Sequence, residues 1–462
     1  MKPEAKWAES GKSSSTCLLS LLEPDCTARL PALPVDEPPL TPMYDSLTTN
    51  LPHPVMAYTS FSFPPETPVF PRAHVIETYL QAYAKHFNLY QHIQFNTSVD
   101  TVERASGQWR VRLSNGQIEV FDFLAVCNGH YRLPRYPDIP GLGGWLGSRR
   151  AIHSAWYRHP ASEYGKNVLV IGAGPSGQDI SSDLVDSGAT VIQSVRASPS
   201  QDIGKIKHRG LVAEIRENGQ VLFEDGTVED GVSFCILATG YKMNFPFFSD
   251  INIIRNAYPP PIPPIPPHLY NSSYHVFPLA RYIFPLVDEN TNIAFLGLLF
   301  RVAPFPLFEA QARAMVHAFA NPSVLDWIRE GIDIVSRYTE LSTKFNSEDP
   351  LVIAREWNRF EPYEQFDYRN ELYKFADAST QKDTVGIPGR IVVPAWERRM
   401  YDAKTILREF WVDLERKGLA EEWVKGVGLG GPHEWVQLLE KMLREARRDS
   451  GESEIDPDKP RL

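Results

Sequence analysis

The stretch that decides the fold is Val168-Leu-Val-Ile-Gly172-Ala-Gly174-Pro-Ser-Gly177-Gln-Asp-Ile-Ser-Ser-Asp-Leu-Val-Asp-Ser-Gly188-Ala-Thr-Val-Ile192. It reads as an apolar strand, a G-x-G-x-x-G turn, a helix from Pro175 onward, a glycine stop and a second apolar strand. This order of elements is the context that the glycine pattern needs before it predicts a dinucleotide-binding unit.

Each glycine of this turn has a physical reason to be there. Gly172 permits the tight turn, Gly174 removes a side chain where a pyrophosphate approaches, and Gly177 lets the helix and strand pack closely. Amide groups at the helix start face the phosphates with a favourable dipole. The alternative interpretation is a glycine turn that binds no ligand.

The end of the second strand discriminates between the two nicotinamide cofactors. A carboxylate there binds a ribose 2′-hydroxyl, whereas a cation accommodates a 2′-phosphate. Gln193-Ser-Val-Arg196 contains no acid and one arginine, which favours NADPH, although Arg196 could also be an ordinary surface charge. The residues expected to bind this cofactor are Gly172, Ala173, Gly174, Pro175, Ser176, Gly177, Gln178, Asp179 and Arg196.

A second match to the same pattern is Gly426-Val-Gly428-Leu-Gly-Gly431. It follows a polar, helix-like run and precedes Pro432, so it has neither the strand nor the helix that the motif requires. We interpret it as a loop.

Outside this unit, strand-like and helix-like patterns alternate, which predicts α/β layers. Expected strands are 93–99, 109–113, 118–127, 214–216, 221–224, 234–238 and 293–299, and expected helices are 72–86, 308–319 and several after 395. Tyr258 to His268 is so rich in proline that it should run as a stiff polyproline stretch.

Composition narrows the class of protein. The chain has 462 residues, of which 43% are hydrophobic and 23% charged, as in an ordinary globular protein of two or three domains. A net charge of −10 argues against nucleic acid as a main partner.

The most apolar stretch, 293–308, is interrupted by Arg301 and two prolines, so we expect no transmembrane helix. Four scattered cysteines form no metal-ligand or disulfide spacing, which favours a reducing, cytoplasmic location and no metal site.

Several separated segments resemble the flavin-containing monooxygenases. In chain order they are Ser46-Leu-Thr-Thr-Asn50-Leu-Pro, Ala125-Val-Cys-Asn-Gly-His130-Tyr with Pro137-Asp-Ile-Pro-Gly141, Ala238-Thr-Gly-Tyr241 and Phe308-Glu-Ala-Gln-Ala-Arg313. Each motif alone is modest, but their joint order over residues 41–320 is specific. The family signature around His153 matches imperfectly, and this histidine reads equally as a packed residue or as a hinge between domains.

The resemblance implies an α/β fold with two dinucleotide-binding, Rossmann-like domains, the NADPH domain being inserted in the FAD domain. The expected parts are an irregular N-terminal arm (1–40), a discontinuous FAD-domain-like part (41–160 and 270–390), the NADPH-binding domain (165–245), a Pro-rich connector (246–269) and a helical C-terminal extension (391–462).

The resemblance also implies a mechanism, in which NADPH reduces FAD, O2 adds at flavin C4a, and the hydroperoxide passes one oxygen to a soft nitrogen or sulfur centre of a small molecule. Asn50 is the candidate catalytic residue, because a neutral amide donates a hydrogen bond without supplying a proton. The alternative is a turn residue before Leu51-Pro52. Further cofactor contacts are expected from Thr49, Asn50, Val99, Thr239, Gly240 and Gln311, although a solvent-facing helix position would also explain Gln311.

The chain departs from the family at its start, where relatives carry a G-x-G-x-x-G loop for the FAD pyrophosphate. Residues 1–40 contain one glycine, Gly11, so we expect the first FAD βαβ unit to be missing. Two hypotheses follow: an FAD- and NADPH-dependent monooxygenase, or an impaired NADPH-binding protein or truncated gene product that no longer holds FAD. HExxH, GxSxG and C-x-x-C motifs are all absent, which leaves hydrolase, metalloenzyme and dithiol chemistry without support.

Overall fold

The structure is a computed structural model that describes residues 37–196, 200–287, 292–377 and 392–449. Its chain forms two compact units. Unit 1 comprises Thr48–Cys127 and the described residues from Pro246 onward, and unit 2 comprises residues 37–47 and Asn128–Phe245. Most of the expected N-terminal arm, with Cys17 and Cys26, lies outside the described residues.

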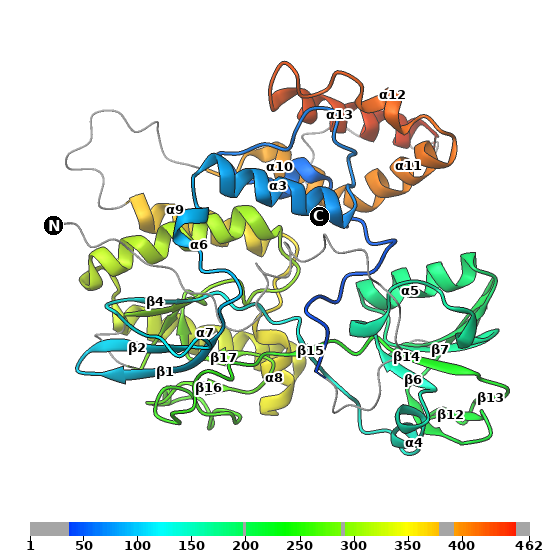
Figure 1. Cartoon of the computed structure of the whole chain (residues 1–462), viewed down its shortest axis with the longest axis horizontal. Helices are drawn as coiled ribbons and strands as arrows, with labels where there is room; N and C mark the ends of the chain where they lie inside the picture. The colour runs from blue at the N-terminus through cyan, green and yellow to red at the C-terminus, as the bar shows by residue number, and fades with distance from the viewer. Residues whose placement is uncertain (1–36, 197–199, 288–291, 378–391, 450–462) are drawn as a thin grey trace. The chain divides into compact units, whose positions relative to one another are not determined.

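Unit 2 is built on a six-stranded sheet in the order β6-β14-β7-β8-β10-β9. Its strands are β6 (Ala151–His153), β14 (Phe234–Leu237), β7 (Asn167–Ile171), β8 (Thr190–Ser194), β10 (Ile206–Arg209) and β9 (Gln201–Ile203). All pairs are parallel except β9 with β10 at the edge. Helix α5 (Pro175–Asp186) connects β7 to β8 and lies along the sheet (Figure 1). The predicted strand, turn, helix and strand over 168–192 are therefore confirmed.

The apolar run of β7 is buried on both faces, as the central strand of a parallel sheet requires. Val168 and Val170 pack with Ile180 of α5 on one face. Leu169 packs with Trp145 in a second cluster on the other face. Successive side chains of a strand point to opposite faces, so a continuous hydrophobic run fits here where an alternating one would not.

Smaller elements complete unit 2. They are the meander of β11 (Val212–Ile215), β12 (Val221–Phe223) and β13 (Val228–Glu229), the pair of β5 (Leu133–Pro134) and β15 (Tyr241–Lys242), helix α4 (Leu142–Gly147), and the 3-10 turns η3 (Ser154–Trp156) and η4 (Ser162–Tyr164).

Unit 1 combines small sheets with helices. Its strands are β1 (Val99–Ala105), β2 (Gln108–Leu113), β3 (Ile118–Phe121), β4 (Leu124–Val126), β16 (Tyr270–Asn271), β17 (Val276–Phe277), β18 (Leu279–Ala280), β19 (Phe284–Pro285) and β20 (Ile293–Phe295). The first three form an antiparallel sheet, and β4 pairs in parallel with β20. The buried strand expected at 293–299 is thus present, though shorter than its apolar run.

The helices of unit 1 pack in two hydrophobic clusters. They are α2 (His53–Met56), α3 (Ala73–His86), η2 (Tyr90–His92), α6 (Pro304–Ala320), η5 (Pro322–Val324), α7 (Trp327–Phe345), α8 (Pro350–Trp357), α9 (Glu364–Asp377), α10 (Ala395–Asp402), α11 (Lys404–Arg416), α12 (Ala420–Val424) and α13 (His433–Asp449). Side chains of α2, α6, α9, α11 and α13 belong to one cluster, and buried side chains of α7 and α8 belong to the other. The C-terminal helices, orange to red in Figure 1, are therefore packed onto the rest of unit 1.

Three local expectations need correction. The strand predicted over 93–99 begins only at Val99, because Asn96 has a φ of +54° that breaks an extended chain. The alternation over 118–127 belongs to two separate strands, β3 and β4. The proline-rich segment bends at 262–264 and 267–268, so it is an irregular connector and not a straight polyproline stretch.

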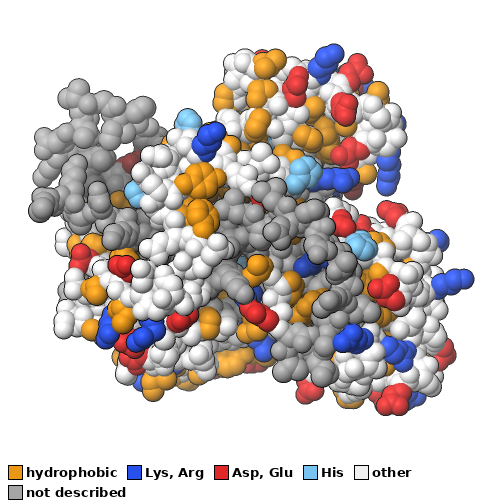
Figure 2. Space-filling model, in the orientation of Figure 1, with side chains coloured by type: hydrophobic (Ala, Val, Ile, Leu, Met, Phe, Trp, Pro, Cys, Tyr) orange, Lys and Arg blue, Asp and Glu red, His pale blue; other side chains and the backbone are white. Residues whose placement is uncertain are grey.

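Surface charge is mixed on the face that Figure 2 shows, where basic and acidic side chains lie interspersed. Within the described residues, no helix is both long and apolar enough to cross a membrane. The same residues contain no cluster of His, Cys, Asp or Glu that could hold a metal ion. A cytoplasmic location stays a prediction.

Candidate functional site

The glycine turn of unit 2 has the geometry that its spacing predicts. Gly172 has a φ of +115°, and a Cβ there would lie 2.4 Å from the Ala238 carbonyl oxygen. A Cβ on Gly177 would lie 2.1 Å from the Gly172 oxygen, so helix and turn touch through backbone alone. Beside Gly174, in contrast, no protein atom lies within 4 Å of the position that a Cβ would take. The turn is therefore tight on the protein side and open where a ligand would approach.

Amides at the start of α5 are left for such a ligand. The amide of Gln178 donates to the Gly174 oxygen at 2.9 Å. Within the described part of the chain, no backbone carbonyl outside the helix accepts from the amides of Ser176 or Gly177. Free amides together with the positive end of a helix dipole form an anion-binding site. This arrangement fits a dinucleotide pyrophosphate.

Gln193 supports the turn from behind, a role that the sequence analysis missed. Its side chain is buried, and Nε2 lies 3.2 Å from the Gly177 oxygen and 3.4 Å from the Gly172 oxygen. The amide thus ties both ends of the turn to β8. The sequence did hold a signal for this role: Gln193 is a polar residue in an apolar strand, and a buried side-chain amide needs hydrogen-bond partners.

The remaining candidates of this unit lie around the turn. Ala173 is half-buried within it, Pro175 is exposed at the first helical position, and Gln178 is exposed one turn into α5. The Asp179 carboxylate accepts a 2.7 Å hydrogen bond from the Tyr44 hydroxyl, which ties α5 to the segment before it. Arg196 is exposed two residues beyond β8, at the end of the strand where a 2′-phosphate would be read.

Thr239 and Gly240 lie beside the buried His153. The Thr239 hydroxyl donates to the Arg135 oxygen at 2.5 Å, and Gly240 has a φ of +77°. His153 Nε2 donates to the Gly240 oxygen at 3.0 Å, and Nδ1 accepts from the Ala155 amide at 3.1 Å. Burial lowers the pKa of His153 to about 4, so the imidazole is neutral. Both ring nitrogens are engaged within the protein, so His153 is a packed, satisfied histidine.

Asn50 of unit 1 lies in an exposed turn. Its neighbour Thr49 is held by its amide, which donates to the Pro71 oxygen at 3.0 Å, and by its hydroxyl, which donates to the Leu51 oxygen at 2.8 Å. Leu51 is buried on the other side. Among the described residues, no hydrogen-bond partner engages the Asn50 side chain itself, so its amide is presented outward from a constrained turn.

The other two candidates of unit 1 lie in regular elements. Val99 is the first residue of β1 and pairs with Leu113. Gln311 is fully buried in α6, which rules out the solvent-facing alternative. Its Oε1 accepts from the Gly297 amide at 3.0 Å, and its Nε2 donates to the Tyr368 hydroxyl at 3.0 Å. The Gln311 amide therefore ties the chain after β20 to α9, and a flavin contact from this residue stays a prediction.

The second glycine pattern is a loop, as expected. The amides of Gly428 and Gly430 donate to one oxygen of Glu434, at 2.7 and 2.9 Å. The Gly426 amide donates to Glu66 at 2.8 Å. This loop therefore holds carboxylates of its own chain.

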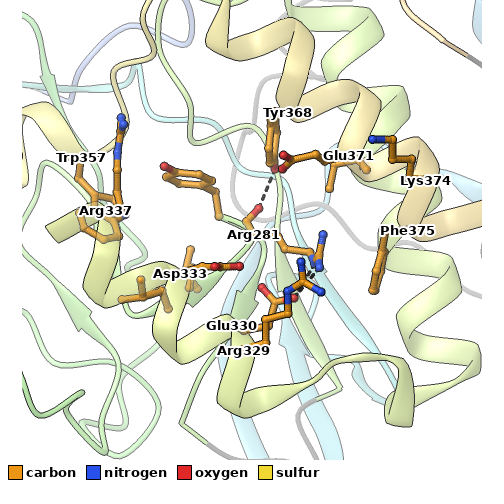
Figure 3. A pocket seen from close by; sticks show the side chains of 14 residues that line it. Arg281, Arg329, Glu330, Asp333, Arg337, Trp357, Tyr368, Glu371, Lys374 and Phe375 are labelled. Carbon is orange, nitrogen blue, oxygen red and sulfur yellow. Dashed lines mark hydrogen bonds and ion pairs between the residues drawn. The ribbon is translucent and has the colours of Figure 1, made fainter. Parts of the chain in front are cut away.

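A cavity of about 610 Å³ lies in unit 1 between the β18–β19 hairpin and helices α7 and α9 (Figure 3). Two of its arginines are paired: Arg281 binds the buried Glu330 at 2.7 Å, and Arg337 binds Glu364 at 2.9 Å. The Tyr368 hydroxyl donates to the Arg281 oxygen at 2.7 Å. None of the predicted site residues lines this cavity, which is thus separate from the candidate site.

Comparison with known proteins decides the family. The family model described as flavin-binding monooxygenase-like matches residues 33–200 and 198–348. The chain belongs to this flavin-binding monooxygenase-like family. Two relatives from Arabidopsis thaliana are flavin-containing monooxygenases. FMO GS-OX-like 2 is 31% identical over 408 residues, which are 79% of this chain and 82% of that protein. FMO GS-OX-like 1 is 34% identical over 399 residues, 78% and 76% of the two chains.

Solved structures share the fold of this flavin-binding monooxygenase-like chain. S-allyl-L-cysteine S-oxygenase from Allium sativum superposes with a TM-score of 0.66 at 23% identity, over 92% of this chain and 90% of that one. Tmm from Pelagibacter sp. strain HTCC7211 has a TM-score of 0.59 at 20% identity, over 80% and 77%. The expected α/β fold with two Rossmann-like domains is thereby confirmed.

Family membership makes this protein an enzyme of the flavin-containing monooxygenase kind, with FAD and NADPH as cofactors, as the resemblance implied. The glycine turn of unit 2 fits the nicotinamide dinucleotide. For the FAD diphosphate the described residues supply no comparable strand, glycine turn and helix. The other glycine pattern, at Gly426, cannot take this role, because its amides bind carboxylates of the chain itself. We therefore assign no residue to that diphosphate.

Proposed function

We propose that this protein transfers one oxygen atom of O2 to a soft nitrogen or sulfur centre of a small molecule and uses NADPH as reductant. The observation that carries this proposal is the open glycine turn at Gly172–Gly177, with free amides and Arg196 nearby, in a chain of the flavin-binding monooxygenase-like family. In balance, substrate, O2, NADPH and a proton give oxygenated substrate, NADP+ and water.

The roles that we propose for this chain are those of holding and orienting. The amides of Ser176 and Gly177 bind the NADPH diphosphate, and Arg196 neutralises the 2′-phosphate. The Asn50 amide donates a hydrogen bond at the reacting centre without introducing a titratable proton. FAD, when bound, supplies the activation of O2.

The test uses the purified chain incubated with FAD and then given NADPH, 18O2 and either a dialkyl sulfide or a tertiary amine. We expect bound flavin, NADPH oxidation that depends on the substrate, and one 18O atom per product molecule by mass spectrometry. The matched variant without a nucleotide site is Gly174→Val, whose side chain fills the open side of the turn and should abolish NADPH oxidation. Absence of NADPH oxidation in the wild-type protein with either substrate would refute the proposal.

The second candidate function is an NADPH-binding protein that does not oxygenate. It is favoured by the lack, among the described residues, of a turn for the FAD diphosphate. Equilibrium dialysis distinguishes the two functions: NADP+ binding without stoichiometric FAD binding supports the second candidate, and binding of both supports the first.

In the same assay, Asn50→Ala tests the proposed catalytic amide. We expect less of the oxidised NADPH to yield oxygenated product and more of it to yield H2O2. The ratio of product to H2O2 should fall about tenfold, because one hydrogen bond at the reacting centre is lost. Asn115→Ala, in an exposed turn of the antiparallel sheet, is the control and should leave the ratio unchanged.

A further inference from the structure

The turn that presents Asn50 is held by a helix from the far end of the chain. The guanidinium of Arg408, on α11, donates through Nη1 to the carbonyl oxygen of Thr49. The two residues are 359 positions apart in sequence. Thr49 is thus fixed by its amide, its hydroxyl and its carbonyl, and its carbonyl belongs to the peptide group that leads directly into Asn50.

Arg408 also touches the segment on the other side of the turn. Its Cζ atom lies 5.9 Å above the centre of the buried Phe70 ring, next to Pro71, whose oxygen accepts from the Thr49 amide. One guanidinium therefore bridges the two chain segments that form the turn. The helix that carries the arginine is packed in place, because its Leu407 and Trp411 are buried in the core that also contains Leu51.

Independent contacts join the C-terminal helices to the segment that follows Asn50. The ring of His53 lies between Phe63 and Trp435 of α13, with centroid distances of 4.7 and 4.4 Å. Glu66 donates its amide to the Val427 oxygen at 2.9 Å. Helix α11 thus contacts Thr49, α13 contacts His53, and the loop between α12 and α13 contacts Glu66.

We propose that Arg408 is a positioning residue for Asn50, and that α10–α13 form a clamp that holds the Thr49–Leu51 turn in the conformation in which the Asn50 amide faces a ligand. The inference rests on the role proposed above for Asn50. Its physical basis is that a carbonyl which loses a charged donor in a half-buried site loses one of the few constraints on its peptide plane. The turn then samples other orientations, and the amide of Asn50 moves with it.

Hydrogen–deuterium exchange tests the clamp without any turnover. The protein without added cofactors is compared as wild type, Arg408→Gln, Arg408→Lys and Arg416→Gln, the last being an exposed arginine at the end of the same helix. We expect the peptide that contains the amides of Thr49 and His53 to exchange about tenfold faster in Arg408→Gln, the factor that loss of a charged hydrogen bond predicts. Arg408→Lys keeps one donor and should show a smaller increase, and Arg416→Gln none.

Turnover tests the consequence for Asn50. In the FAD-supplemented protein, Arg408→Gln should shift the ratio of oxygenated product to H2O2 in the same direction as Asn50→Ala, with partial recovery in Arg408→Lys. Added to Asn50→Ala, Arg408→Gln should change this ratio no further, because the amide that it positions is already gone. A merely structural role would lower the amount of folded enzyme without moving this ratio.

The outcomes separate the clamp from the proposed function. Unchanged exchange at Thr49–His53 in both Arg408 variants would overturn the clamp, whatever the enzyme does. Faster exchange with an unchanged product ratio, in a protein whose ratio does respond to Asn50→Ala, would overturn the positioning role. If wild type oxidises no NADPH, the proposed function fails, and the exchange comparison still decides the clamp. Should Arg408→Gln not fold, Arg408→Lys provides the same comparison.

Discussion

The Nε2 atom of Gln193 lies 3.2 Å from the carbonyl oxygen of Gly177, so a buried amide on β8 holds the first turn of α5 against the sheet. The same atom lies 3.4 Å from the oxygen of Gly172. The glycine turn is therefore supported from the protein side by one donor while its amides are left open on the other side.

Replacement of Gln193 by leucine should weaken nucleotide binding. Two carbonyls lose a buried donor, which costs about 1–3 kcal/mol, and the turn loses its support. We expect the Kd for NADP+ to rise about tenfold and the thermal midpoint to fall, measured by isothermal titration calorimetry and by thermal unfolding. Gln201→Leu, exposed on edge strand β9, is the control and should change neither quantity. An unchanged Kd in Gln193→Leu would show that the support is dispensable.

Substitutions of two glycines of the turn should have different effects, one on nucleotide binding and the other on stability. A Cβ at Gly174 would meet no protein atom within 4 Å, and the residue has an ordinary φ of −72°, so Gly174→Val should fold normally yet lose NADP+ binding, because its side chain fills the ligand side. Gly177→Ala forces a Cβ against the Gly172 oxygen and should destabilise unit 2 by about 1–3 kcal/mol. Urea unfolding with NADP+ titration measures both quantities. Normal NADP+ affinity in Gly174→Val would contradict the assigned binding face.

Arg196 should decide between the two nicotinamide cofactors. Arg196→Gln removes a charge-assisted contact to a 2′-phosphate, so we expect the affinity for NADP+ to fall about 10- to 100-fold and that for NAD+ to change little. Competition binding measures both affinities. Arg216→Gln, exposed after β11 in the same unit, provides the comparison. Equal losses for the two nucleotides would assign Arg196 to a general structural role.

His153 should make the protein sensitive to mild acid. Burial lowers its pKa from an ordinary 6.5 to about 4, so it stays neutral in the folded protein while the unfolded chain takes up a proton. Above pH 6.5 both states are neutral and the difference does not affect stability; as the pH falls from 6.5 towards 4, the unfolded chain binds a proton that the folded protein does not, and stability is lost. At pH 5 the loss amounts to about 2 kcal/mol.

Urea unfolding at pH 7.5 and at pH 5 measures this effect. His153→Gln cannot titrate, so the drop in unfolding free energy between the two pH values should shrink by about 2 kcal/mol. His433→Gln, exposed at the start of α13, should leave the drop as in wild type. Identical pH dependence in wild type and His153→Gln would argue against a neutral buried imidazole.

Part of the fold could be predicted because its determinants are close together in the chain. The unit from Val168 to Ile192 needs only an apolar run, three spaced glycines and a helix, all of which are local features. Strand ends were less predictable. The pattern at 93–99 suggests a strand, but the left-handed backbone at Asn96 postpones it to Val99, and no periodicity reveals such a residue.

The sequence by itself determined the nucleotide-binding unit and the position of Arg196 at the end of its second strand, because both depend on residues within one short segment, and it determined the order of motifs that identifies the family, because each of those motifs is a short segment. Only the tertiary structure decided that Gln193 supports the glycine turn, that Gln311 is buried between Gly297 and Tyr368, and that Arg408 holds the Thr49 carbonyl. The physical reason is that a hydrogen bond between distant residues forms only when packing brings their segments together, and the local pattern of the chain does not tell which residues will meet.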